Sequence, residues 1–243
     1  AASSPPSAVQ IRLVELLCLS TRACSVVPGC VEVVSTCVFH AAVSNRLKQV
    51  GLKFLAHLFA NASPKLLSVV SPSMFKGLHN LVKKMASRVA NTATMKVGGG
   101  NASVVADQKM QEEMIALVES LFMAVAQLAR CQPKLFAGVN GEGVAVTRTL
   151  FHTMAGSEID QRIRLAARGA LAAIRNSFVT LSSEGLNSLS LATRSALLRE
   201  TMEFLRGSND QSDSLLEVLV DWLHPSSTIF FFPANAVIPT DAS

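Results

Sequence analysis

The chain has 243 residues, of which 49% are hydrophobic and 16% charged, and it contains no Tyr. So apolar a chain can offset the entropy of ordering, which excludes disorder for most of it, and its length suits one large domain or one extended array. Lys and Arg exceed Asp and Glu by five, and the first 100 residues hold eleven basic side chains against two acidic ones. This uneven charge predicts a basic patch near the start, open to nucleic acid, anionic lipid or an acidic protein surface.

The first part of the chain predicts helices, because apolar residues recur at intervals of three and four and no segment alternates like a strand. The Ala at position 1 indicates a piece of a longer protein. Residues 1–7 are expected to be disordered. A helix over about 8–26 is broken by the Pro-Gly pair at 28–29, and a second helix ends near His40. Ser44 is expected to cap the third helix.

That third helix ends where Ser63 precedes Pro64, because a residue before proline is pushed out of the α region. Residues 91–104 are expected to form a flexible break, since they include three consecutive glycines, which lose too much backbone entropy in a helix. No phosphate-binding loop is indicated there, because a preceding strand and the Lys-Ser/Thr pair are both missing. Between the proline and this break, a helix shows one apolar face: Phe75, Leu78, Val82, Met85 and Val89.

The second part begins with a long helix over about 106–130, which Pro133 ends. A helix over 143–155 follows. Ser157, with Asp160 three residues on, resembles a capping box and is expected to start a helix that runs to about Phe178. In it, acid-first i, i+4 ion pairs are predicted: Glu158 with Arg162, and Asp160 with Arg164. Further helices are predicted over about 189–206 and 214–224, followed by an irregular tail at 225–243.

One pattern occurs twice, around Pro64 and around Pro133. In each copy a long helix ends at the proline, a Lys-Leu-apolar turn follows, and a second helix opens some residues later. A third copy, without the proline, begins at Ser157. Helical hairpins that cannot bury their apolar faces alone must stack on one another. We therefore predict an all-α fold, an α-α superhelix (a HEAT/armadillo-like solenoid of antiparallel helix pairs) over residues 8–224, with apolar faces exposed at both ends.

Side chains with catalytic or metal-binding chemistry are scattered along the chain. Cys37 and His40 have the spacing of half a zinc site, but no second pair exists, so a core thiol and an ordinary histidine are favoured. Cys131 lies at a predicted helix C-terminus, where the helix dipole disfavours a thiolate. The nucleophile-elbow and dinucleotide-binding motifs are missing. The sequence predicts no enzyme, no catalytic residue, no cofactor and no metal site.

No segment is predicted to cross a membrane. A spanning helix needs about twenty apolar residues. The best candidate, Ile115 to Ala129, is too short and carries Glu119 in its middle.

A cluster of four basic residues is the one feature that we interpret as a contact surface, for an acidic partner. Its members are Lys76, Lys83, Lys84 and Arg88. The cluster lacks interleaved aromatic residues for stacking bases, which argues against single-stranded nucleic acid. The eight Met residues are spread along the chain and are mostly interpreted as core filler.

The repeat units resemble the N-terminal HEAT array of the proteasome adaptor and scaffold proteins, the large proteasome-associated HEAT-repeat family. The resemblance covers about Asn45 to Phe178 and departs from the family pattern at Gly169, where the family tends to have an acid, and in the Gly-rich insertion. The matching residues are Leu128, Pro133, Leu135-Phe136, Leu150-Phe151 and the segment from Arg164 to Leu171, RLAARGAL.

This resemblance implies a non-enzymatic adaptor that binds the 26S proteasome and helps its assembly or stability. The five cysteines, odd in number and set in helical patterns, favour reduced thiols and so a cytoplasmic or nuclear protein. Proteasome subunits would be its partners, with no small-molecule substrate and no specific nucleic acid. Three alternatives stay open at this point. A general HEAT scaffold such as a nuclear-transport receptor would bind Ran or cargo, an enzyme would gather reactive groups in one deep pocket, and a membrane-surface protein would bind liposomes in a salt-sensitive way.

Overall fold

The computed structural model describes six stretches of the chain and three single residues. These are residues 8–19, 29–40, 43–95, 104–136, 141–156 and 158–183, with 195, 199 and 202. All the regular structure in these stretches is helical, as the sequence predicts. The helices are α1 (Ala8–Leu19), α3 (Cys30–Phe39), α4 (Asn45–Asn61), α5 (Pro64–Met95), α6 (Val104–Cys131), α7 (Pro133–Phe136), α8 (Glu142–Ala155) and α9 (Gln161–Ser183).

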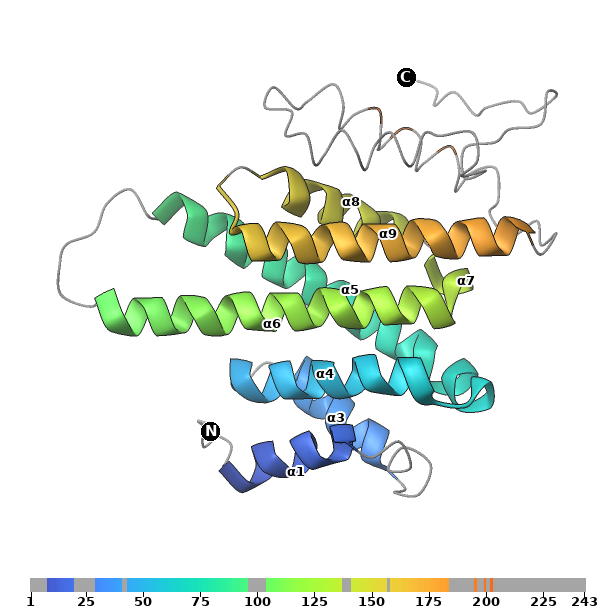
Figure 1. Ribbon diagram of the computed structural model, residues 1–243, viewed down its shortest axis with the longest axis horizontal. Coiled ribbons are helices and arrows are strands. Elements are labelled where there is room, and N and C mark those ends of the chain that lie inside the picture. Colours follow the sequence, from blue (N-terminus) through green and yellow to red (C-terminus); the bar gives the residue numbers. More distant parts are fainter. Residues whose placement is uncertain are drawn as a thin grey trace.

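The helices form two layers (Figure 1). In the first layer α1, α4, α6 and α9 lie side by side, and α4, α6 and α9 run in the same direction. In the second layer α5 lies between α3 and α8 and packs on both. The short α7 packs against α6, α8 and α9. Two residues separate α4 from α5, and α5 runs back from the end of α4.

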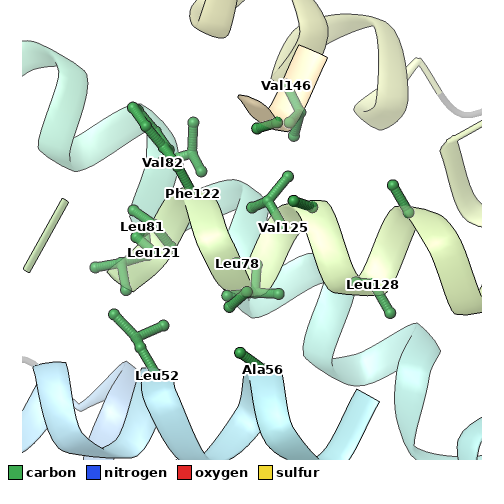
Figure 2. Packing of buried hydrophobic residues seen from close by; sticks show 14 of the residues in the cluster. Leu52, Ala56, Leu78, Leu81, Val82, Leu121, Phe122, Val125, Leu128 and Val146 are labelled. Carbon is green, nitrogen blue, oxygen red and sulfur yellow. The ribbon is translucent and has the colours of Figure 1, made fainter. Parts of the chain in front are cut away.

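A single hydrophobic core lies between the layers and extends from Cys30 to Phe178. Its centre is α6, where Leu121 and Leu128 are fully buried. In Figure 2, Leu52 on α4 points toward α6 from one side and Val146 on α8 approaches it from the other. The apolar spacing of three and four along each helix therefore produces a stripe that faces the neighbouring layer.

The first copy of the proline pattern folds differently from the prediction. The chain leaves α4 after Asn61, but no second helix opens some residues after Pro64, because α5 begins at Pro64 itself. Proline suits the first helical position, where no amide donor is required, and the Ser63 hydroxyl accepts a hydrogen bond from the Leu66 amide at 3.4 Å. α5 then continues through Pro72 to Met95, into the first residues of the expected break.

The second copy follows the predicted course. α6 ends at Cys131, α7 is a single turn that starts at Pro133, and α8 opens at Glu142. The third helix is also capped as predicted, since the Ser44 hydroxyl accepts from the Leu47 amide at 3.3 Å.

The start of α9 corrects another prediction. The helix begins at Gln161 rather than near Ser157, and Asp160 is its cap, because its carboxylate accepts a hydrogen bond from the Arg162 amide at 2.8 Å. The Arg162 side chain does not turn back toward Glu158. It reaches across to α6, where it donates to Glu119 at 3.0 and 2.6 Å and to Glu112 at 2.9 Å. An ion-pair network therefore joins α6 to α9.

Several predicted segments lie outside the described residues. They are the disordered start at 1–7, residues 20–26 of the first helix, the three glycines, nearly all of the helices at 189–206 and 214–224, and the tail at 225–243.

One helix among the stretches that the structure describes is long and apolar enough to cross a membrane. It is the segment Gln108–Cys131 of α6, with a mean hydropathy of 1.6. The candidate judged from sequence, Ile115 to Ala129, is shorter than this segment. However, 61% of the apolar window is buried inside the protein. Packing against α4 and α9 therefore accounts for the apolar composition of α6.

Candidate protein-contact surfaces

The thiols and histidines show no reactive arrangement in the described stretches. No group of three His, Cys, Asp or Glu side chains there could hold a metal ion. Cys30, Cys37 and Cys131 are free thiols. Burial raises the pKa of Cys131 to about 11, although a backbone hydrogen bond opposes that rise. At neutral pH this thiol is protonated, which makes it a poor nucleophile.

The four basic residues predicted as a contact surface all lie exposed on α5. We call them the basic surface. Lys76 and Lys83 are seven residues apart and so share one helix face to within about 20°. Lys84 and Arg88 lie about 100° and about 140° around the helix from Lys83, on a neighbouring face. The structure thus divides the predicted cluster into two adjacent pairs.

The second of these pairs lies near a buried cation that the sequence reasoning missed. Lys48 of α4 is only 5% exposed. Burial lowers the pKa of Lys48, and the positive charges of Lys84 and Arg88 lower it further. The basic surface therefore extends inward from α5 to α4. Little in the sequence indicates that Lys48 belongs to this surface, because Lys48 and Lys84 are 36 positions apart and only folding brings them together.

A second surface, also missed, is a groove of about 730 Å³ across the first layer. We call it the α4–α6–α9 groove, because residues of those three helices line it and none of α3, α5 or α8 does. Among its lining residues are Lys53 of α4, Glu119, Met123 and Arg130 of α6, and Leu165 and Gly169 of α9.

The groove exposes apolar side chains that a closed core would bury. Met123 is 48% exposed and Leu165 is 55% exposed. The interpretation of the methionines as core filler is therefore wrong for Met123, although it holds for Met74 and Met85, which are buried. The one sequence signal that could have indicated this surface is Gly169, which interrupts an Ala-rich helix and departs from the resembled family at that position.

The N-terminal end of the array also carries exposed apolar residues, as the stacking argument predicts. Val9, Leu13 and Leu16 of α1 are each more than half exposed. They are spaced by four and three residues and therefore form one stripe on the outermost helix of the first layer. The C-terminal end lies outside the described residues, so that part of the prediction stays a prediction.

Fold and surfaces together define the class: a layered all-helical protein whose distinctive features, within the residues described, are surfaces for contact rather than a constellation of reactive groups. Comparison with protein families gives a match over residues 1–225 to the family described as proteasome component ECM29, N-terminal. The chain belongs to this family, as the resemblance predicted, and the family is associated with the proteasome. Searches of curated proteins and of solved structures each found no match to the chain.

Proposed function

We propose that the chain is part of a non-enzymatic HEAT-repeat scaffold that binds the 26S proteasome and helps its assembly or stability in the cytoplasm and nucleus. The observation that carries the proposal is the family match over residues 1–225, to a family described as a proteasome component.

The helical arrangement supports the scaffold role. Successive helices alternate between the two layers, and each first-layer helix packs on the next. A solenoid is built in this way, by repeats that stack mainly on their neighbours, and it offers long surfaces for several partners at once. We propose that these layers are a segment of such a solenoid.

We propose the basic surface as a contact with an acidic partner on the proteasome. Its four members are exposed, and they belong to the first 100 residues, in which eleven basic residues accompany two acidic ones. A surface of one sign steers and orients a partner of the opposite sign.

The test is affinity purification of the full-length protein carrying Glu at positions 76, 83, 84 and 88. We expect co-purified proteasome subunits to fall about tenfold, since a close contact loses attraction and gains repulsion. A matched control reverses the charge of four other exposed cations: Arg46, Lys65, Lys109 and Lys134. Unchanged recovery with the first variant would show that the basic surface is not the contact. Absence of proteasome subunits from the wild-type purification, with Ran or transport cargo recovered instead, would favour the nuclear-transport alternative.

A further inference from the structure

We propose that the α4–α6–α9 groove binds an amphipathic helix of a partner protein, one that carries apolar residues on one face and carboxylates beside them. The groove lies on the first layer, whereas the basic surface lies on α5 in the second layer. The inference therefore concerns a separate interaction and does not depend on the proposed proteasome contact.

The apolar part of the groove favours a macromolecular occupant. Met123 and Leu165 line it and are about half exposed, so the groove is open to solvent. A small-molecule pocket usually buries most of its ligand. Exposed Met on a helical surface suits a helix partner, because the flexible thioether adapts to different apolar side chains.

The dimensions suit a short helix. From Ala116 to Arg130, the α6 residues that line the groove cover about 21 Å of helix axis. That length matches about four turns of a docked helix, with anchors at positions i, i+4, i+7 and i+11.

Gly169 supports a close approach by that helix. A Cβ atom added at Gly169 would meet no atom of this protein within 4 Å. The glycine therefore has no packing reason within the described structure, yet it costs α9 about 1 kcal/mol relative to Ala. A partner backbone that comes near α9 at this point would explain it, because the absence of a side chain lets two helices approach closely.

Charge identifies the partner as acidic. Four charged residues line the groove, and two of them, Arg162 and Glu119, pair with each other at 2.6 Å. The other two, Lys53 and Arg130, are exposed and make no ion pair with any residue that the structure describes. Carboxylates beside the apolar face of a docked helix would pair with these two cations.

The test selects helical peptides of about 15 residues from a displayed library against the 243-residue chain. We expect the selected peptides to have an apolar face and net negative charge, and to bind about tenfold more weakly to Leu165→Asp and Gly169→Trp variants. Met110→Asp is the matched control, since Met110 is also an exposed Met on α6, 61% exposed, and does not line the groove. Circular dichroism confirms that each variant is folded.

Three outcomes would overturn the proposal. One is a selection that yields no binder, or only basic peptides. Another is a set of acidic peptides whose binding the groove variants leave unchanged. The third is a different occupant: self-association in analytical ultracentrifugation, or binding to phosphatidylserine vesicles, that Leu165→Asp abolishes and Met110→Asp does not.

Discussion

The carbonyl of Ala129 lies in the last turn of α6, and the residue four positions on is Pro133, which has no amide proton to donate. Ser177 of α9 takes the place of that donor. Its hydroxyl lies 2.7 Å from the Ala129 carbonyl oxygen and 2.7 Å from the Ala173 carbonyl oxygen of its own helix. The serine is buried, so the bond to Ala129 satisfies a group that water does not reach.

We expect Ser177→Ala to lower the free energy of unfolding by about 1–3 kcal/mol, because it leaves the Ala129 carbonyl without a partner. Denaturant unfolding of the chain measures this. The control is Ser120→Ala: this buried hydroxyl bonds only to the Ala116 carbonyl of its own helix, at 2.8 Å, and that carbonyl also accepts a helical amide. Equal losses from the two variants would contradict the role assigned to Ser177.

The buried Lys48 makes the stability of the chain depend on pH and on the charges that surround this lysine. Because the pKa of Lys48 is lowered in the fold, this lysine opposes folding at neutral pH, where it is charged. The opposition disappears as the pH rises toward the lysine pKa of the unfolded chain, about 10.4. Lys84→Glu replaces a repulsion by an attraction and should raise the unfolding midpoint by about 2 °C in low salt, with less effect in high salt. Lys83→Glu, on the adjacent face of α5, should leave the midpoint unchanged.

Neither Lys48 nor Ser177 could be recognised from the sequence. A lone lysine or serine in a helix has the same local pattern whether it is solvated or buried. Whether such a side chain is buried depends on a partner far away in the sequence. Ser177, for example, bonds to a carbonyl 48 residues earlier. The exposed cations Lys76 and Lys83, by contrast, were recognisable, because a charged residue opposite an apolar helix face points to solvent.

At the scale of single helices, the periodicity of apolar residues was sufficient to locate α3, α4, α6 and α8, and local caps such as Ser44 were predictable because they depend on neighbours within one turn. The course of α5 could not be predicted in this way, because this helix continues through Pro72. A proline inside a helix costs about 3 kcal/mol, which favours a break at Pro72. The buried residues that follow, Met74 and Phe75, outweigh that cost, and the Phe75 ring meets the Phe136 ring edge-on at 4.8 Å. Tertiary packing thus overrides local preference.

Gly143 of α8 and Gly169 of α9 differ in the space around them: Gly143 is tightly packed, whereas Gly169 is open. A Cβ at Gly143 would lie 2.0 Å from the Phe136 carbonyl oxygen, so α8 packs directly against the backbone of α7. We expect Gly143→Ala to destabilise the chain by about 1–3 kcal/mol through overpacking. Gly169→Ala should instead stabilise it by about 0.5–1 kcal/mol, since the site is open and the helix gains a better former. Thermal unfolding distinguishes them, and a stabilised Gly143→Ala variant would disprove the close contact.

Over the whole molecule, the first-layer helices lie in a row with α6 between α4 and α9. The sequence predicted that helices stack but could not reveal which faces remain open. The α4–α6–α9 groove depends on how three helices, far apart in the chain, lie beside one another. The proposed solenoid has a mechanical consequence: a weakened repeat should loosen both of its neighbours.

Leu121→Ala tests this consequence. Leu121 is fully buried on α6, and the loss of its side chain should lower the free energy of unfolding by about 2–5 kcal/mol, because a cavity remains where α6 packs on its neighbours. If stacking transmits the loss, amide hydrogen exchange measured by mass spectrometry should speed up in both α4 and α9 as well as in α6. Met110→Ala, at an exposed position on the same helix, should change neither. Faster exchange confined to α6 would show that the helices are not coupled as a stacked array.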